Sequence, residues 1–401
     1  MKGVPKRAEG LAPKALGDLG LNLLAGDLMM PAAVIRESAL RHNIAAMQAF
    51  ADQHGALLCP HGKTSMSPEL FAMQLDAGAW GLTAATAHHV RLYRRLGIGR
   101  ILLANQLVGK ADVEFILAEL AEHPEFDFYC LADSIEAVDA LAAAASAAGL
   151  ERPVQLLVET GIPSGRAGVR DIESALALAR RISASPSLAL CGVETFEGVS
   201  QARPDARPDA AGMLDLAVAA AEAAALEGLF AEGPVMLSAG GSAFLDLCAA
   251  RLPDAIGGRD VTKVIRPGCY VTHDHGIYRR IARAPRLEPA LEVWGTVLSL
   301  PESGLAIVGV GKRDVSTDVD PPQPLFVHRP GEAGGPRPAD GLRTLQLWDQ
   351  HLSLDCSAGA LAVGDMVGFG ISHPCATFDR WRALFTVDEG YRVTGAVTTL
   401  F

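Results

Sequence analysis

A single lysine follows a short apolar run near the start of the chain. The run is Ala56–Cys59, it is followed by Pro60 and Gly62, and Lys63 comes next. A run this short, bounded by proline and glycine, is typical of a buried parallel strand that opens into a loop. Lysine is costly to bury, so Lys63 is either a solvated loop residue or an amine with a chemical role. In the second case the amine is a nucleophile that forms an imine with an aldehyde cofactor.

A glycine-rich turn, Ser238–Ala243, lies between a later apolar run and a helical segment. Free backbone N–H groups at such a turn can hold a phosphate, and small residues let the phosphate come close. The same composition also suits a plain tight turn, so this segment alone leaves both interpretations open. An imine-forming lysine and a phosphate site together indicate pyridoxal 5′-phosphate (PLP).

The third candidate is the pair His373 and Cys375, which are two residues apart. In an extended segment residues at this spacing point to the same face, so imidazole and thiolate could converge on one metal ion. Nitrogen with sulfur suits zinc, and manganese or magnesium would need further oxygen ligands. A histidine and a cysteine at this spacing also occur in ordinary packing without a metal.

Eight short apolar runs alternate with alanine- and leucine-rich segments of helical period. The runs are Ala56–Cys59, Trp80–Thr83, Ile101–Ala104, Phe126–Cys130, Val154–Val158, Leu188–Val193, Val235–Leu237 and Lys263–Ile265. This alternation predicts an α/β fold with a parallel (β/α)8 TIM-type barrel, although a doubly wound open sheet would alternate in the same way.

In such a barrel, chemistry is located where the strands end at their C-terminal side. The polar and glycine-rich candidates at these ends are His61, Lys63, Arg166, Ser238, Gly240, Gly241, Ser242, Arg266, Gly268 and Tyr270. Phosphate sites of these barrels are commonly built after strands seven and eight, which favours the phosphate interpretation of Ser238–Ala243.

After about Arg286 the short apolar runs are separated by turn residues, and no long helical stretch intervenes. This pattern predicts a C-terminal all-β domain. We therefore expect a PLP-binding barrel over residues 36–285 and a β domain over 286–401 that carries the metal pair. Residues 1–35 complete the β domain, because Met30–Ile35 reads as a strand.

The composition is that of an ordinary globular enzyme, with 49% hydrophobic and 20% charged residues among 401. A formal net charge of -11 argues against nucleic acid and anionic membranes as partners. No apolar run approaches the ~18 residues of a membrane span. Seven scattered cysteines do not suggest a disulfide framework, and Met1–Pro13 lacks the apolar core of a signal peptide. A cytoplasmic location fits these features best.

The sequence resembles the fold-type III PLP enzymes, the alanine-racemase-like barrels, from Pro31 to about Arg382. It is most similar to the group that contains D-threonine aldolase, D-threo-3-hydroxyaspartate dehydratase and eukaryotic-type D-serine dehydratase. The motifs that carry the resemblance are Pro60-His61-Gly62-Lys63-Thr64, Gly165-Arg166-Ala167-Gly168, Ser238–Ser242, Arg266-Pro267-Gly268-Cys269-Tyr270 and Ser372-His373-Pro374-Cys375-Ala376-Thr377. Gly62 stands where many relatives have a larger apolar residue, and the Thr195–Ser200 loop lacks the His and the Ser/Tyr pattern usual in the aldolases, which leaves the substrate open.

The resemblance implies roles for the candidate residues. Lys63 would carry PLP, with His61 and Arg166 as its catalytic neighbours and Arg166 beside the phenolic oxygen of PLP. The PLP-binding set would be Lys63, Arg166, Ser238, Gly240, Gly241, Ser242, Arg266, Gly268 and Tyr270. The metal ligands would be His373 and Cys375, with zinc favoured over manganese or magnesium. The family also implies a homodimer.

The implied activity is a lyase reaction on a β-hydroxy D-amino acid. A D-serine dehydratase (ammonia-lyase) that yields a 2-oxo acid and ammonia is favoured, and D-threonine aldolase chemistry that yields glycine and an aldehyde is the alternative. An amino-acid racemase or a non-catalytic PLP carrier is more remote. A racemase needs a second base on the opposite face, and a carrier would not need the metal pair.

Overall fold

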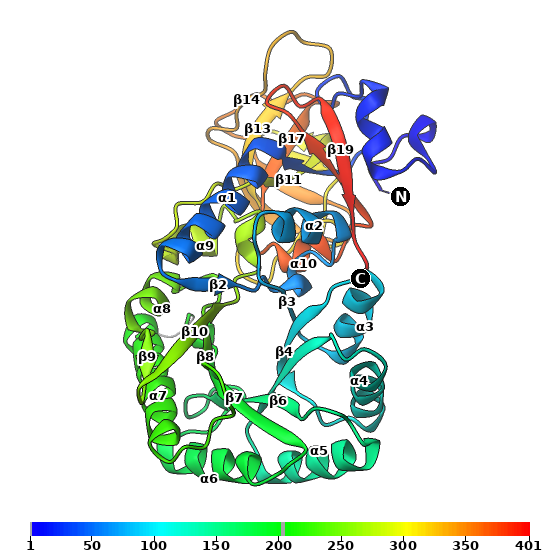
Figure 1. Cartoon of the computed structure of the whole chain (residues 1–401). Helices are drawn as coiled ribbons and strands as arrows, with labels where there is room; N and C mark the ends of the chain where they lie inside the picture. Colours follow the sequence, from blue (N-terminus) through cyan, green and yellow to red (C-terminus); the bar gives the residue numbers. More distant parts are fainter. Residues whose placement is uncertain (1, 202–204) are drawn as a thin grey trace.

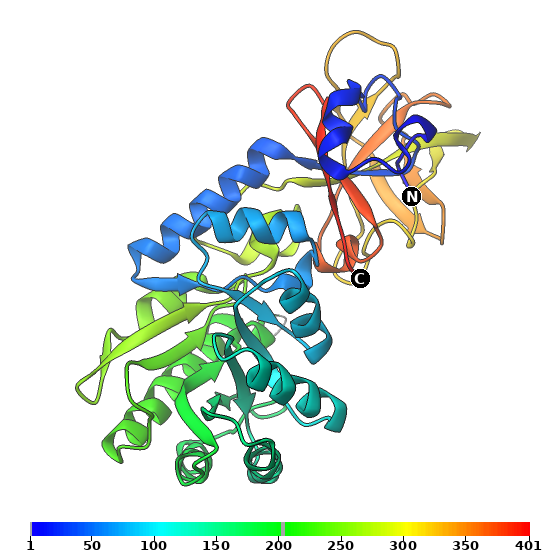
Figure 2. The ribbon, with the colours of Figure 1, turned by 45° about the vertical axis from the view of Figure 1, so that its right-hand side comes forward.

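The computed structural model describes residues 2–201 and 205–401 and consists of two parts, each built on one sheet. One part is a ring of parallel strands surrounded by helices, and the other is an antiparallel β domain at one end of that ring (Figure 1). Figure 2 shows the same two parts in a view turned by 45°, with the β domain at one end of the barrel.

Eight parallel strands form the barrel in the order β2-β10-β8-β7-β6-β5-β4-β3. Their bounds are β2 (Ala56–Leu58), β3 (Leu82–Ala84), β4 (Arg100–Gln106), β5 (Asp127–Ala132), β6 (Val154–Thr160), β7 (Leu188–Thr195), β8 (Val235–Ala239) and β10 (Arg259–Ile265). A parallel bridge between His61 and Thr83 connects the first strand to the second and closes the ring. The two-residue strand β9 (Ala255–Ile256) only pairs with the start of β10. The predicted barrel is therefore confirmed, and each expected apolar run contributes to one strand.

The helices cover the outside of the ring (Figure 1). They are α1 (Glu37–Gln53), α2 (Pro68–Asp76), α3 (Ala87–Arg95), α4 (Lys110–Glu122), α5 (Ile135–Ala148), α6 (Ile172–Ser183), α7 (Ala206–Leu226) and α8 (Leu245–Arg251). Four of them begin at a residue whose side chain accepts a backbone N–H from the first turn, namely Ser67, Thr86, Ser134 and Asp171. Such caps satisfy N–H groups that have no partner inside the helix, which defines where each helix starts.

Apolar residues of the strands pack on both faces of the barrel wall. Leu102 belongs to a cluster formed only by strand and strand-end residues, which fills the interior of the ring. Its neighbours Ile101 and Leu103 belong to a larger cluster shared with the helices. Successive residues of a strand point to opposite faces, so the continuous apolar run of β4 reflects burial on both sides.

The β domain is a ten-stranded, mostly antiparallel sheet. Its strands are β1 (Ala32–Arg36), β11 (Leu291–Glu302), β12 (Leu305–Val308), β13 (Gln323–His328), β14 (Arg337–Pro338), β15 (Arg343–Leu347), β16 (Leu352–Asp355), β17 (Met366–Gly370), β18 (Ala383–Val387) and β19 (Val393–Thr398). Strand β1 lies in the middle, antiparallel to β11 and parallel to β18. The sequence analysis did not predict β14, β16 or β18, so the domain has more strands than expected.

Short elements lie between these strands and at the junction of the two parts. The helices are α9 (Ile277–Ile281) and α10 (Cys375–Phe378), and the 3-10 turns are η1 (Lys6–Ala8), η2 (Pro13–Leu19), η3 (Gly62–Thr64), η4 (Glu197–Ser200) and η5 (Cys269–Val271). Helix α10 of the β domain contacts η3 of the barrel. No helix in residues 2–201 and 205–401 is long and apolar enough to cross a membrane.

Gly192 tests how closely the barrel strands pack. It lies in β7, where an added Cβ would collide with the carbonyl oxygen of Met236 in β8. We expect Gly192→Ala to lower the free energy of unfolding by about 3 kcal/mol, because the strand backbone must shift. The control is Gly212→Ala in α7, where nothing lies within 4 Å of the new Cβ and the protein should gain up to about 1 kcal/mol. Denaturant unfolding measures both changes, and equal stability of the two variants would contradict the prediction.

Candidate active site and metal centre

A cavity of about 270 Å³ opens at the C-terminal ends of the barrel strands. Ten of the twelve candidate residues predicted from the sequence line it: His61, Lys63, Arg166, Gly240, Gly241, Ser242, Arg266, Gly268, His373 and Cys375. Nine further residues that the sequence analysis did not select complete the main part of its wall: Thr64, Asn105, Gln106, Glu159, Ala167, Glu194, Phe196, Cys269 and Tyr278. Strand ends that are far apart in the sequence therefore surround one space, as the barrel topology requires.

Ser238 and Tyr270 are the two candidates outside the lining of this cavity. Both are buried. The Ser238 hydroxyl donates a hydrogen bond to the carbonyl oxygen of Val264, and the Gln74 side-chain amide donates to the Tyr270 hydroxyl at 2.9 Å. In this structure these two side chains stabilise the barrel wall, and their predicted contact with the phosphate stays a prediction.

Lys63 lies in the 3-10 turn η3, directly after β2. Its side chain is partly buried and lines the cavity, and none of the described acidic residues pairs with its amine. Gly62 allows the turn to pack tightly, because a Cβ there would collide with the hydroxyl of Tyr93. The lysine is therefore positioned by a turn that tolerates no side chain at the preceding residue, and its amine remains available for a reaction.

Arg266 and Glu194 form a buried ion pair in the cavity wall. Each keeps one side-chain atom without a hydrogen-bond partner among the described residues: the guanidinium Nε of Arg266 and the carboxylate Oε2 of Glu194. The buried Nδ1 of His61 also lacks a hydrogen-bond partner within residues 2–201 and 205–401. Buried polar atoms are normally hydrogen-bonded, so three such atoms around one cavity indicate a site for a polar ligand.

The charges around the cavity shift its titratable groups. Burial, together with the positive charges of Lys63 and Arg266, holds the pKa of His61 well below its usual value, so the imidazole is neutral. Burial and the nearby carboxylate of Glu194 raise the pKa of Glu159 to about 7. The amide of Gln106 donates a hydrogen bond to Glu159 and opposes this shift. A histidine with a lowered pKa and a carboxyl group with a raised pKa are both typical of functional sites.

The glycine-rich turn after β8 binds an anion within the protein itself. The N–H groups of Gly240 and Gly241 donate to the two carboxylate oxygens of Glu197, at 3.0 and 2.9 Å. Glu197 is fully buried, and burial raises its pKa. Gly241 has no room for a side chain, because a Cβ would lie 2.7 Å from the ring of Phe196. The turn therefore has the donors that the phosphate interpretation requires, but Glu197 was missed by the sequence analysis.

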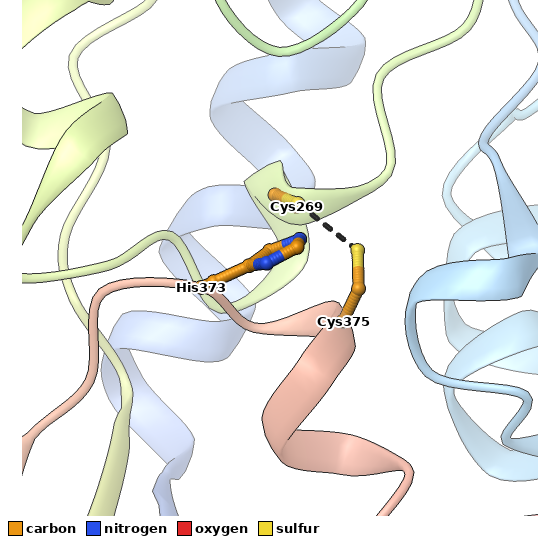
Figure 3. A group of neighbouring side chains, drawn as sticks. All are labelled: Cys269, His373 and Cys375. Atoms are coloured by element: carbon orange, nitrogen blue, oxygen red, sulfur yellow. Dashed lines mark hydrogen bonds between the residues drawn. The ribbon is translucent and has the colours of Figure 1, made fainter. Parts of the chain in front are cut away.

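Cys269, His373 and Cys375 form a cluster of potential metal ligands at the edge of the cavity (Figure 3). One ligand atom of each lies within 4.8 Å of the others, and the two sulfur atoms are 3.4 Å apart. No other group of this kind occurs among the residues that the structure describes. The sequence analysis quoted Cys269 within a motif but assigned it no role.

The reason given for pairing His373 with Cys375 was wrong, although the two side chains do converge. The segment is not extended, because Pro374 has φ -57° and ψ -47° and Cys375 begins helix α10. A helical turn at proline brings the side chains together instead. Nδ1 of His373 lies 2.5 Å from a carboxylate oxygen of Asp318, and Cys375 Sγ lies 3.3 Å from the hydroxyl oxygen of Thr64.

The environment favours the thiolate form of Cys375. Hydrogen bonds from Cys269 and His373 hold the pKa of Cys375 well below its ordinary value. The hydrogen bond between His373 and Cys375 also raises the pKa of His373, to about 9. A thiolate is the form of cysteine that binds metal, so Cys375 is the sulfur prepared for a cation, whereas the hydrogen bond with Cys375 raises the pKa of Cys269.

The raised pKa of Glu159 can be tested by the pH dependence of the protein's stability. Its folded-state pKa of about 7 lies above the ordinary 4.5, so the folded protein holds one proton more than the unfolded chain between these values. Stability is then lost as the pH rises through this window, by about 3 kcal/mol in total. We expect Glu159→Gln to remove this part of the pH dependence in denaturant unfolding between pH 5 and pH 8. The exposed Glu114→Gln is the control, and a pH-independent difference between Glu159→Gln and the unchanged protein would contradict the assignment.

Comparison with known proteins places two family models on the chain. The model described as "Alanine racemase, N-terminal domain" matches residues 35–273, and "Putative serine dehydratase domain" matches residues 290–387. D-threonine aldolase of Arthrobacter sp is 27% identical over 366 residues, which are 90% of this chain and 89% of the aldolase. D-threo-3-hydroxyaspartate dehydratase of Delftia sp. (strain HT23) is 31% identical over 290 residues, 72% of this chain and 73% of that enzyme.

Among solved structures, a cysteine-to-alanine mutant of D-threo-3-hydroxyaspartate dehydratase in the metal-free form superposes with a TM-score of 0.76. It is 25% identical, and the match covers 95% of this chain and 99% of that one. Both the barrel and the β domain are therefore shared with proteins of this kind.

Proposed function

Because the chain belongs to the alanine racemase N-terminal domain family, we propose that it is a PLP- and divalent-metal-dependent lyase acting on β-hydroxy D-amino acids. Within that class we propose a D-serine dehydratase (ammonia-lyase), which releases a 2-oxo acid and ammonia. The observation that carries the proposal is that the amine of Lys63 and the Cys269, His373 and Cys375 cluster line the same cavity. A β-elimination needs both a base at Cα and assistance to a leaving hydroxyl.

The residues of the cavity fit PLP. Lys63 offers an amine without an acidic partner among the described residues, and the unpaired Nδ1 of His61, Oε2 of Glu194 and Nε of Arg266 could each bind a polar ligand. The N–H groups of Gly240 and Gly241 bind a carboxylate and would suit a phosphate equally. The phosphate would compete with Glu197 for these two donors.

PLP, when bound, acts as an electron sink that makes the Cα proton of an amino acid removable. The protein supplies the base. Lys63 would hold the cofactor covalently in the resting enzyme, and its freed amine would take the Cα proton. The neutral His61 and the exposed Arg166, whose guanidinium lies 4.9 Å from the ring centre of Phe196, would orient the bound molecule.

His373 and Cys375 would hold the divalent metal, which supplies a Lewis acid for the β-hydroxyl. The donor set of imidazole and thiolate fits zinc better than magnesium or manganese. Asp318 orients the imidazole through Nδ1, a partner commonly found for metal-bound histidines. The metal would thus be held by the β domain, while the amine is held by the barrel.

D-threonine aldolase chemistry is the second candidate. It is favoured by the match to the aldolase of Arthrobacter sp over 90% of this chain. A retro-aldol step would use the same metal to acidify the β-hydroxyl, so the two reactions need the same ligands and differ in the bond that breaks.

Product analysis separates the two candidates. We expect D-serine to yield pyruvate and ammonia, and D-threonine to yield 2-oxobutanoate, with little glycine or acetaldehyde. Stoichiometric glycine and acetaldehyde from D-threonine would instead establish the aldolase. Failure of both substrates, together with unreacted 3-hydroxy-D-aspartate, would overturn the lyase proposal for this substrate class.

Covalent labelling tests the role of Lys63. Borohydride reduction in the presence of PLP should attach the pyridoxyl group to Lys63, because the side chain of Lys63 lines the cavity. Lys63→Ala should lose the label and at least about 10³-fold in turnover, as expected when a covalent catalyst is removed. Lys110→Ala is the control, because Lys110 is exposed and pairs with Glu114 on the surface of α4. A label on another lysine, found by peptide mapping, would contradict the assignment.

Metal removal should separate the loss of the β-hydroxyl group from the removal of the Cα proton. With a chelator, or in His373→Ala, turnover of the β-hydroxy substrate should fall by about 10²-fold or more, because the leaving group loses its Lewis acid. Exchange of the Cα proton with deuterated solvent should persist, since that step depends on Lys63. Full turnover without metal would mean that the cluster is structural at most. The matched control is His351→Ala, an exposed histidine in the β domain.

A further inference from the structure

We propose that Cys269 is a third protein ligand of the metal, so that the site is a Cys2His centre selective for zinc with one coordination position left open. The inference rests on the metal role proposed for His373 and Cys375. It adds a barrel residue that no motif or comparison singles out as a ligand.

The spacing of the three side chains suits a single ion. Zinc–sulfur bonds of about 2.3 Å at a tetrahedral angle place two sulfur ligands roughly 3.8 Å apart. The sulfur atoms of Cys269 and Cys375 are 3.4 Å apart, and the chosen ligand atoms of all three residues lie within 4.8 Å of one another. Small side-chain rotations therefore suffice to close the three atoms around zinc. Figure 3 shows the imidazole and both thiols directed toward a common point.

Cys269 is held in place by the barrel. It begins the 3-10 turn η5 after β10, is 5% exposed, and its backbone N–H donates to the hydroxyl of Ser242 at 3.2 Å. The preceding Gly268 has no space for a side chain, because a Cβ would lie 2.9 Å from the carbonyl oxygen of His61. The position of the Cys269 thiol is thus set by the same loops that form the cavity floor.

Neighbouring groups prepare the other two ligands in the way expected around a metal. The carboxylate of Asp318 occupies Nδ1 of His373, which leaves Nε2 as the nitrogen available for coordination. The hydroxyl of Thr64 lies 3.3 Å from the sulfur of Cys375. Thr64 belongs to the turn that carries Lys63, so the metal ligands and the proposed base share one supporting segment.

A third ligand changes the chemistry of the site. Two thiolates and an imidazole form a soft donor set, which favours zinc or cobalt over magnesium and manganese. Three protein ligands also leave one tetrahedral position, the arrangement of catalytic zinc sites, instead of two. The three ligands line the same cavity as Lys63, so the hydroxyl of a bound substrate would be able to reach that position. With Cys269 from the barrel and His373 and Cys375 from the β domain, the metal would also connect the two parts of the protein.

The experiment uses the PLP-loaded enzyme and the metals themselves as probes, without substrate. Equilibrium dialysis measures the affinity for zinc, magnesium and manganese, and the near-ultraviolet sulfur-to-cobalt absorption of the cobalt-substituted protein counts thiolate ligands. We expect one zinc per chain and the absorption of two thiolates. Cys269→Ser should weaken zinc binding by roughly 100-fold, given the affinity of complete sites. Its cobalt absorption should fall to about half, and magnesium affinity should hardly change.

Cys356→Ser is the matched control, because Cys356 is a buried free cysteine of the β domain outside the cluster. It should leave both readouts unchanged, and the PLP absorbance should be retained in both variants. Should Cys269→Ser lose PLP, the wild-type cobalt absorption decides the question, since one thiolate and two differ twofold.

Unchanged zinc affinity in Cys269→Ser, or the absorption of a single thiolate in the wild-type protein, would overturn the proposal while leaving His373 and Cys375 as ligands. Absence of metal binding to the wild-type protein would overturn it together with the metal part of the proposed function. Because no turnover is measured, the result does not depend on whether the enzyme is a dehydratase or an aldolase.

Discussion

The position of strand β1 is the constraint on which the rest of the molecule depends. β1 is the first strand of the chain, yet it lies in the middle of the C-terminal sheet between β11 and β18. Four of its five residues are fully buried, and the chain passes from it directly into α1, whose residues pack against the barrel. Because β1 cannot leave the sheet without exposing this core, the β domain is held at one end of the barrel.

This placement brings the two chemical groups of the proposed site together. The loop that carries His373 and Cys375 comes from the β domain, and the turns that carry Lys63 and Cys269 come from the barrel. Their meeting point is the contact between α10 and η3, where Cys375 lies beside Thr64. In the proposed function, the amine and the metal ligands on this one cavity would act on adjacent carbon atoms of one substrate. Neither part of the protein could do this by itself.

The candidate site also contains buried charged side chains. The ion pair of Arg266 and Glu194 and the carboxylate of Glu197 are held away from water, which costs free energy unless partners compensate. The compensation within the described part of the chain is incomplete, since one side-chain atom of Arg266 and one of Glu194 have no hydrogen-bond partner there. A bound ligand that completes these hydrogen bonds would stabilise the folded protein as well as react in it. Stability and ligand binding are therefore linked at this cavity.

The local sequence was enough to predict the barrel and part of the site. Strands buried on both faces are continuous apolar runs, and the residues that follow them must lie at the same end of a parallel barrel. This reasoning located Lys63 and the glycine-rich turn at the cavity from chain order alone. It missed β16 and β18, although the alternation of Leu352 and Leu354 with polar residues and the apolar run Ala383–Val387 would each have indicated a strand.

What only the tertiary structure decided is which side chains from distant segments meet. Cys269 and Cys375 are 106 residues apart, and Glu197 reaches Gly240 and Gly241 across 43 and 44 residues. No periodicity or spacing records such encounters, because they depend on how turns aim side chains after the elements have packed. His373 and Cys375 show the same limit at short range, since their convergence follows from a helical turn at Pro374 and not from the extended geometry that their spacing suggested. The sequence alone predicted most strands and helices and their order, and only the packing of these elements showed which side chains meet at the candidate site.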